Sequence, residues 1–390
     1  MTRPPTGWHF LQLPGPSNVP ARVLEAISRA TTDHRGPDFP ELTNAVLAGL
    51  RSVMRTSGQV VVVPASGTGG WEAALVNTLS SGDRVLFVET GQFAANWAEV
   101  ARRFGLDVEV VPTDWRRGVD PALLEERLSG DRGHSIAAVA VVHNETSTGA
   151  MTRVADVRSA MDRAGHPALL LVDAVSSVGS VDYRHDEWRV DVTVSASQKG
   201  LMLPPGLAFL ARSERAAEAA KDARLPRSYW DMDAMVAQNE KGYFPYTPAT
   251  NLLFGLREAL AMLEEEGLDA VFRRHARHAR AVREAVRAWG LEMQCVVPDE
   301  MSDVLTAVVM PDGHDADRFR TLVLERFNMA LGTGLGRLKG RIFRIGHVGD
   351  MNDLMLIAAL AGVESGLTLA SVPIERGGVD AAMRSLEQDD

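Results

Sequence analysis

The chain has 390 residues, of which 45% are hydrophobic and 24% are charged, a composition typical of a soluble globular protein with two domains. Its 41 basic and 51 acidic residues give a formal net charge of −10 without any basic block, so nucleic acid and anionic membranes are not expected as partners. The single cysteine, Cys295, excludes an internal disulfide framework and fits a reducing compartment.

The apolar runs and the two ends of the sequence favour a cytoplasmic location. No apolar run reaches the roughly 18 residues that a membrane span requires. The N-terminal stretch MTRPPTGWHF lacks the apolar core of a signal peptide, and the C-terminal stretch SLEQDD is not a peroxisomal signal. We therefore expect a cytoplasmic protein.

The first part of the chain predicts an extended arm followed by an α/β domain. Residues 1–20 form the predicted arm, because the prolines of LQLPGPSNVP (11–20) exclude a regular element. The predicted large domain covers residues 21–255, in which apolar runs indicate strands at 59–65, 83–90, 106–113, 135–144, 167–175, 190–197 and 206–212. Most of these runs are continuous, as expected of strands that are buried on both faces of a mainly parallel sheet. Between the first two, residues 70–80 carry apolar side chains at helical spacing.

After about residue 250 the pattern changes to that of a smaller α+β domain, which we place at residues 256–390. Amphipathic segments predict helices at 251–265, 271–289, 315–327 and 351–369. The segment MQCVVP, which contains Cys295, is predicted to be a strand of this domain.

Candidate functional residues follow the predicted strands, because parallel α/β sheets bind their ligands at the carboxyl ends of the strands. After the first strand, SGTGG (66–70) places Gly67 and Thr68 before a helix, as a phosphate cup or a tight turn. Phe93 follows the second strand and either covers a flat ligand or packs in the core. Thr146 lies in a polar cluster after the fourth strand. Asp173 ends the fifth, as a buried acid that needs a partner or as a cap on the next turn.

Lys199 completes this series. Only four of the 41 basic residues are lysines, so arginine supplies nearly all of the positive surface charge. A lysine is hard to replace only where its amine must lose a proton and act as a nucleophile. Lys199 lies in TVSASQKG, 26 residues after Asp173, which leaves room for one crossover helix. A phosphate cup, an aromatic face, a buried acid and a lysine are together what pyridoxal 5'-phosphate (PLP) requires.

Several motifs along the chain carry a resemblance to a known family. LVDAVSSVGS, HNETSTG, VSASQKG followed by LPPGLAFL, PYTP and RIGHVG resemble the class V aminotransferases of fold type I. Among these, the sequence is most similar to the serine–glyoxylate and alanine–glyoxylate aminotransferases. The resemblance extends from PGPSNVP near the N-terminus to the last predicted helix. It implies a large domain with a mainly parallel sheet, a smaller C-terminal domain and a homodimer.

The resemblance also implies how the cofactor is held. Lys199 would be the Schiff-base lysine, and Asp173 would pair with the pyridine nitrogen. Phe93 and Val175 would pack on opposite ring faces, and Thr146 would bond the ring hydroxyl. The phosphate would be held by Gly67, Thr68, Gln198 and, from the partner subunit, Thr247, with an aromatic residue near Tyr243.

Four further residues are implied in substrate binding. Arg344, in RIGHVG, would bind the α-carboxylate, and its apolar neighbours suggest a strand, although most of the arginines are surface groups. Gly15, between two prolines, would bring backbone close to the substrate. His34 and Arg35, in TTDHRGP, would lie near the substrate site of the partner, unless His34 is only a polar residue beside a helix. The DHR pattern is shared with relatives that use aspartate and glyoxylate.

The expected activity is therefore amino transfer by a ping-pong cycle. A small L-amino acid (serine, alanine or aspartate) would donate its amino group to the cofactor, and glyoxylate would accept it and leave as glycine. The alternatives are a different oxo-acid acceptor such as pyruvate, or a PLP-dependent lyase. A desulfurase needs a cysteine on a mobile loop, and Cys295 in a strand does not fit that role. A non-catalytic PLP-binding protein is disfavoured because Lys199, Asp173 and Arg344 are all present.

Overall fold

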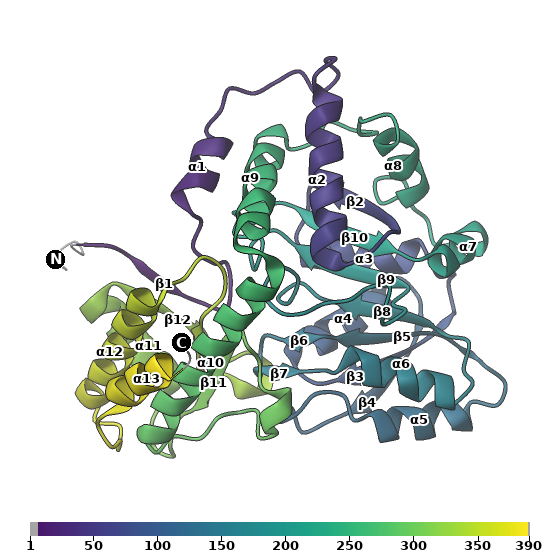
Figure 1. Cartoon of the computed structure of the whole chain (residues 1–390). Helices are drawn as coiled ribbons and strands as arrows, with labels where there is room; N and C mark the ends of the chain where they lie inside the picture. Colours follow the sequence, from purple (N-terminus) through teal and green to yellow (C-terminus); the bar gives the residue numbers. More distant parts are fainter. Residues whose placement is uncertain (1–6, 389–390) are drawn as a thin grey trace.

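Two β-sheets organise the chain (Figure 1). The computed structural model describes residues 7–388, so residues 1–6 of the predicted arm and residues 389–390 of the predicted small domain lie outside the described residues. The larger sheet has the strand order β2-β10-β9-β8-β5-β3-β4. Its strands are β2 (Gln59–Val63), β3 (Arg84–Glu89), β4 (Asp107–Pro112), β5 (Ile136–Val142), β8 (Leu169–Asp173), β9 (Val192–Ala196) and β10 (Ala208–Arg212). Each strand lies within one of the predicted segments, and the predicted α/β class is confirmed.

The larger sheet is mainly parallel and is buried on both faces. Strands β9, β8, β5, β3 and β4 run parallel to one another, whereas β10 runs antiparallel to both β9 and β2. Side chains alternate between two hydrophobic cores, so that Val60 and Val62 belong to one core while Val61 and Val63 belong to the other. Because the inner strands meet water on neither face, most of their positions are apolar, which explains the continuous apolar runs, whereas the edge strand β4 is only partly buried.

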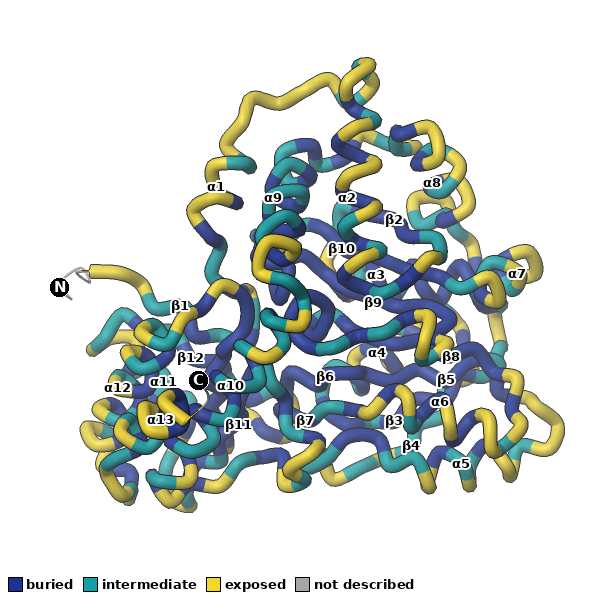
Figure 2. The backbone as a smooth tube through the Cα atoms, viewed as in Figure 1, coloured by how far each residue is buried: buried dark blue, intermediate teal, exposed yellow. Residues whose placement is uncertain are grey.

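Helices cover both faces of this sheet, and their outer sides are exposed while the strands are buried (Figure 2). One core lies under α2 (Phe39–Met54), α5 (Pro121–Gly130), α6 (Val154–Arg163) and α9 (Thr250–Glu266). The other lies under α3 (Gly67–Val76), α4 (Gln92–Arg103), α7 (Glu214–Asp222) and α8 (Met232–Asn239). Helix α3 begins at Gly67, before the predicted start at residue 70, so the glycine loop is its first turn.

The smaller sheet has the order β1-β12-β13-β11 and lies against the last helices of the chain. Its strands are β1 (Phe10–Gln12), β11 (Leu305–Val309), β12 (Met329–Thr333) and β13 (Ile342–Gly346). The helices beside it are α10 (Leu268–Ala288), α11 (Ala316–Phe327), α12 (Asp353–Leu369) and α13 (Gly378–Glu387). Four helices, α9 to α12, confirm the predicted ones. Within residues 7–388, no helix is both long and apolar enough to cross a bilayer.

Two sequence predictions differ from the structure. The segment around Cys295 is not a strand: Met293 makes an isolated bridge to Val308, and the chain then enters a short 3-10 helix at Pro298–Glu300. In the arm, Leu11 and Gln12 belong to β1, where the prolines were expected to exclude any regular element. Strand β1 ends before Pro14 and pairs only with β12, at the edge of the sheet. Prolines can follow an edge strand because their missing N–H groups remove no hydrogen bond from the sheet.

The two cores meet along α10. Val271 of this helix belongs to the core of the larger sheet, and Ala281 belongs to the core of the smaller one. The predicted domain boundary at residues 255 and 256 falls earlier, inside the continuous helix α9. Helix α10 therefore spans both halves, which the N-terminal arm also connects.

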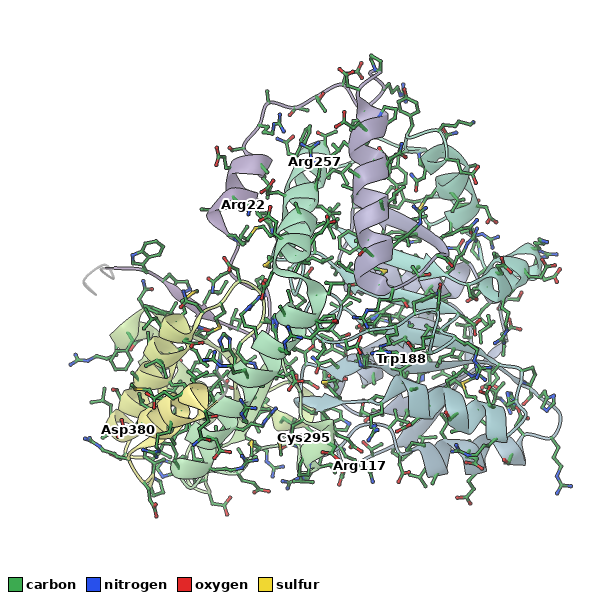
Figure 3. The ribbon with its side chains drawn as sticks, in the orientation of Figure 1. Arg22, Arg117, Trp188, Arg257, Cys295 and Asp380 are labelled. Carbon is green, nitrogen blue, oxygen red and sulfur yellow. The ribbon has the colours of Figure 1, made fainter. Side chains whose placement is uncertain are left out.

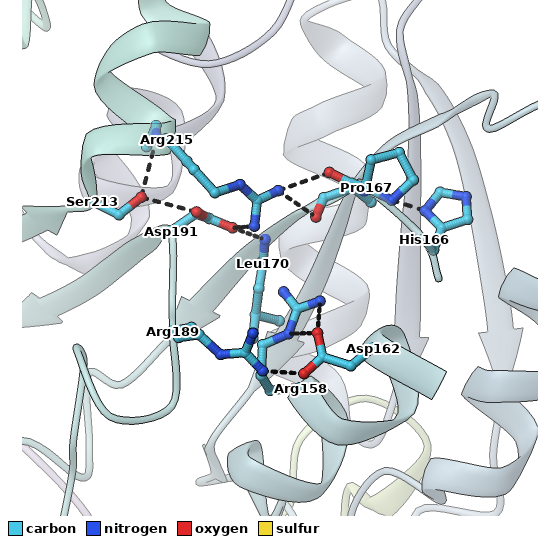
Figure 4. Close-up of polar contacts among 11 residues, drawn as sticks. Arg158, Asp162, His166, Pro167, Leu170, Arg189, Asp191, Ser213 and Arg215 are labelled. Carbon is cyan, nitrogen blue, oxygen red and sulfur yellow. Dashed lines mark hydrogen bonds and ion pairs between the residues drawn. The ribbon is translucent and has the colours of Figure 1, made fainter. Parts of the chain in front are cut away.

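Hydrogen bonds and ion pairs of charged residues hold the amino ends of β8 and β9 in place (Figure 4). Asp191 is buried; it accepts hydrogen bonds from Leu170 N at 2.8 Å and Ser213 Oγ at 2.9 Å, and it pairs with Arg215 at 3.3 Å. On the neighbouring helix, Arg158 pairs with Asp162. These contacts hold the amino ends of the strands in place. The candidate site lies at the other edge of the sheet, at the carboxyl ends.

Candidate active site

The site is built around Lys199, which follows the carboxyl end of β9. The Lys199 side chain is only 8% exposed, and its Nζ donates a hydrogen bond to Pro14 O at 2.6 Å. Burial, reinforced by the positive charge of Arg344, lowers the pKa of Lys199 to about 7. A substantial fraction of this amine is therefore unprotonated at neutral pH, as nucleophilic and proton-transfer chemistry require.

Asp173 ends the neighbouring strand β8 and is also buried. Its Oδ1 accepts a hydrogen bond from Val175 N at 2.8 Å, and its Oδ2 accepts one from Trp71 Nε1 at 2.9 Å. Burial raises the pKa of Asp173 to about 7, although both hydrogen bonds favour the carboxylate. The carboxylate thus bonds an indole of α3 rather than capping the next turn through a serine.

Arg344 reaches the site from β13 of the smaller sheet. Its guanidinium is nearly buried, with Nε donating to Thr333 O at 2.8 Å and Nη1 donating to Thr146 O at 2.7 Å. Burial lowers the pKa of Arg344 to about 10, so the group stays protonated at neutral pH. Within the described part of the chain, Nη2 has no hydrogen-bond partner. A buried cation oriented by two carbonyls is suited to bind a carboxylate.

A polar hairpin, β6 (Asn144–Glu145) and β7 (Ala150–Met151), brings Thr146 to the site. The Thr146 hydroxyl donates to Ser176 Oγ at 3.1 Å. Phe93, half-buried in the first turn of α4, packs edge-to-face on Trp71 with ring centroids 6.4 Å apart. Trp71 therefore contacts both Phe93 and Asp173.

The glycine loop forms the N-terminus of α3 beside Val175. A Cβ atom on Gly67 would lie 2.7 Å from Val175 Cγ2, so only glycine lets the helix approach this closely. Ser66 caps the helix without a side-chain hydrogen bond, and Thr68 is exposed. The first N–H groups of a helix have no partner within it, and they bind anions readily. Nearby in sequence to Lys199, the buried Gln198 Oε1 has no partner among the described residues.

The N-terminal arm lies between Lys199 and Arg344. Ser17 N donates to Gln198 O at 3.0 Å, and Ser17 Oγ donates to Lys199 O at 2.9 Å. Gly15 has φ +131°, and a Cβ there would lie 2.3 Å from Lys199 Nζ. On the other side, a Cβ on Gly332 would lie 2.8 Å from Pro14 Cδ and 2.9 Å from Arg344 Cβ. The arm therefore closes the space between the two sheets.

This arrangement agrees with comparisons to known proteins. The model of the family "Aminotransferase class-V" matches residues 9–337. The chain belongs to the class-V aminotransferases. It is 48% identical to the serine–glyoxylate aminotransferase of Methylorubrum extorquens, over 100% of this chain and 98% of that one. It is 45% identical to the L-aspartate–glyoxylate aminotransferase of Paracoccus denitrificans, over 96% of both chains. Its fold matches the pyridoxamine–pyruvate aminotransferase of Mesorhizobium loti with a TM-score of 0.91 at 29% identity, over 98% of this chain and 97% of that one.

Four predicted residues of this aminotransferase lie apart from Lys199. His34 and Arg35 belong to the segment between α1 (Ala21–Ile27) and α2, which arches over the top of Figure 1. Tyr243 and Thr247 lie beside this segment: Phe39 packs on Phe244, and a Cβ on Gly242 would lie 2.3 Å from Pro40 Cβ. Among the described residues, the four make no contact with Lys199 or Asp173. They form a second group at one end of α2, where Arg35 and Thr247 are exposed.

The sequence analysis missed two residues of the site. Trp71 lies in the helical segment predicted at residues 70–80 and was given no role. The available signal was that a buried indole N–H requires an acceptor. Glu145 precedes Thr146 in the polar cluster after the fourth predicted strand, and no role of its own was predicted for it. Its carboxylate is fully buried and bonds the N-terminus of α4.

Proposed function

We propose that this transaminase uses PLP to move the amino group of a small L-amino acid to glyoxylate, producing glycine and a 2-oxo acid. One observation carries the proposal: the buried amine of Lys199 lies beside a buried carboxylate and a buried guanidinium. Amino acids and 2-oxo acids both present a carboxylate for such a guanidinium.

The residues present fit the cofactor. Both oxygens of Asp173 accept N–H donors, which favours the charged carboxylate that a pyridine nitrogen needs as a partner. The partnerless N–H groups at Gly67 and Thr68 offer donors to a phosphate, and the side-chain NH₂ group of Gln198 would be a further donor. Phe93 and Val175 would face the ring, Thr146 would bond its hydroxyl, and Lys199 would hold it through Nζ.

When bound, PLP supplies an electron sink that labilises the substrate Cα and carries the amino group between the two half-reactions. The protein residues have separate tasks. Arg344 would bind the α-carboxylate and so orient the Cα. Lys199 Nζ, with its pKa near neutrality, would take up the Cα proton and return it. The arm at Gly15 would exclude water from the space above Lys199.

We further infer that the working unit is a homodimer. In the second group, Arg35 and Thr247 are exposed at one end of α2, His34 and Tyr243 are half-buried, and none of the four contacts Lys199 of its own chain. Supplied to the site of a second copy, Thr247 would reach the phosphate, and Arg35 would reach the side chain of the donor. An arginine there suits a donor with a second carboxylate, so aspartate is as strong a candidate as serine or alanine. The 45% identity to the L-aspartate–glyoxylate enzyme supports this choice.

Desulfuration is not supported by the position of the cysteine. Cys295, labelled in the lower part of Figure 3, lies just before the short 3-10 helix at Pro298–Glu300. Its thiol is buried and donates to Glu300 O at 3.5 Å, and burial raises its pKa to about 11. A buried, protonated thiol is a poor sulfur acceptor.

The test is a substrate panel with the PLP-loaded protein. Serine, alanine and aspartate are each offered with glyoxylate, and serine and aspartate are also offered with pyruvate. The glycine or alanine that forms is measured together with the 2-oxo acid that the donor leaves. We expect glycine with at least one donor. Absence of glycine with every donor would refute glyoxylate as the acceptor. An Arg35→Ala variant, whose substitution lies outside the Lys199 group, should lose aspartate activity selectively if Arg35 binds the second carboxylate.

A further inference from the structure

Glu145 is a fully buried carboxylate to which the proposed chemistry assigns no task. Its side chain has no ion-pair partner within residues 7–388, yet it accepts several hydrogen bonds. Oε1 accepts from Ser147 Oγ at 2.6 Å, Ser147 N at 3.0 Å and Phe93 N at 3.4 Å, and Oε2 accepts from Ala94 N at 3.1 Å. Burial raises the pKa of the Glu145 carboxyl, and these hydrogen bonds oppose that shift, because all the partners are donors and stabilise the charged carboxylate.

These contacts cap helix α4 from another part of the chain. The residue before the helix, Gly91, has no side chain to cap it. Instead, Glu145 accepts from Phe93 N and Ala94 N, while Ser147 Oγ accepts from Gln92 N at 2.9 Å. The negative charge also interacts favourably with the helix dipole.

The fit around this cap is close. A Cβ on Gly91 would lie 2.4 Å from Glu145 Cγ and 2.5 Å from Ser147 Oγ. The backbone of Gly91 is extended there, so the glycine is required for space and not for its backbone angles. The carboxylate consequently lies directly against the first turn of α4, which carries Phe93.

Glu145 also connects this turn to the substrate side of the site. The next residue, Thr146, accepts the hydrogen bond of Arg344 Nη1 through its carbonyl oxygen. The negative charge of Glu145 is the one that most favours the protonated form of the Arg344 guanidinium, against the effect of burial. The Glu145 carboxylate therefore contacts the backbone of Phe93 directly and is linked to Arg344 through the neighbouring residue, Thr146.

We propose that Glu145 is a positioning residue, an anionic cap that fixes Phe93 against the bound cofactor and holds the hairpin that orients Arg344. This inference rests on the proposed function, because it takes Phe93 to be the face on which the PLP ring packs. Glu145 itself touches neither cofactor nor substrate in this assignment. Its effect is transmitted through the first turn of α4 and through the Thr146 carbonyl.

The test is Glu145→Gln, with Glu99→Gln as the matched control. Glutamine keeps the size but replaces one acceptor oxygen by an NH₂ group that faces backbone N–H donors. Loss of a hydrogen bond to a charged group predicts a PLP dissociation constant roughly 10- to 100-fold higher. The visible circular dichroism of the bound cofactor should change, and KM for the donor should rise because Arg344 is less well held. Glu99 is exposed on the same helix, paired with Arg102 and Arg103, and its variant should match the wild type.

The outcomes separate this inference from the proposed function. Unchanged PLP affinity and circular dichroism in Glu145→Gln, with only a lower melting temperature, would overturn the positioning role. Failure of the wild-type protein to bind PLP would overturn both the proposed function and this inference. If Glu145→Gln does not fold, Ser147→Ala tests the positioning role instead. This variant removes one donor to Glu145 and the acceptor for Gln92 N, and it should raise the PLP dissociation constant by a smaller factor. An unchanged dissociation constant would overturn the role.

Discussion

The hydrogen bond from Trp71 to Asp173 leads to a quantitative prediction. Trp71→Phe removes the Nε1–H that Asp173 Oδ2 accepts at 2.9 Å, and it leaves this buried carboxylate with one protein donor, Val175 N. The substitution also removes part of a ring that stacks on Trp97 with centroids 6.0 Å apart. The loss of the hydrogen bond depends on the charge of Asp173, whereas the loss of ring packing does not. Measurements at several pH values therefore separate the two effects.

The magnitude follows from the two forms of Asp173. A hydrogen bond to a charged group contributes about 1.5–3 kcal/mol, and one to a neutral group contributes about 0.5–1.5 kcal/mol. The difference of about 1 kcal/mol or more would raise the Asp173 pKa of the variant by about one further unit, at about 1.4 kcal/mol per unit. The wild-type pKa is raised by burial to about 7. The variant should therefore lose about 1–3 kcal/mol through packing at every pH, and the additional loss should appear as pH rises from about 6 to 9.

The assay is urea unfolding of the cofactor-free wild type and variant between pH 5 and 9. Buried histidines titrate in both proteins, so their effect cancels in the difference between the two free energies of unfolding. Trp97→Phe is the control, because Trp97 is equally buried but its Nε1 bonds neither Asp173 nor any other described residue. A difference for Trp71→Phe that does not change with pH, or one that persists unchanged in an Asp173→Asn background, would refute the reasoning.

Three further predictions concern the site and the acid stability. Lys199→Ala should abolish the visible absorbance of bound PLP after dialysis, and persistence of that absorbance would assign the cofactor to another lysine. Arg344→Lys should raise KM for the amino donor roughly 10- to 100-fold, since a planar bidentate donor is lost; an unchanged KM in steady-state kinetics would remove Arg344 from carboxylate binding. Burial lowers the pKa of His143 to about 4 and that of His275 to about 3, from an unfolded value near 6.5. Below pH 6.5 the unfolded chain thus binds more protons than the folded one, and each histidine should lower the free energy of unfolding by about 1–2 kcal/mol at pH 5. A His275→Gln variant should therefore lose less stability than the wild type between pH 7 and pH 5, as measured by urea unfolding.

The position of Lys199 and Asp173 at one edge of the sheet could be predicted from the sequence because the signals are local. Lys199 and Asp173 each follow a continuous apolar run, and such runs mark buried strands whose carboxyl ends meet at one edge of a sheet. Motif similarity added Arg344 and Gly15, and the structure brings both to Lys199. The strand predicted around Cys295 was wrong because a short apolar run does not distinguish a strand from a buried irregular segment.

The sequence by itself determined the strands of the larger sheet and the residue types available at its edge, because burial imposes an apolar pattern on neighbouring residues. Only the tertiary structure decided how those residues are held. Trp71 bonds an aspartate 102 positions away, and Pro14 O accepts from a lysine 185 positions away. Contacts of this kind join segments that are far apart in the chain, and they depend on how helices and sheets pack. No local pattern records that packing, so the contacts of Trp71, Glu145 and Pro14 emerged only from the fold.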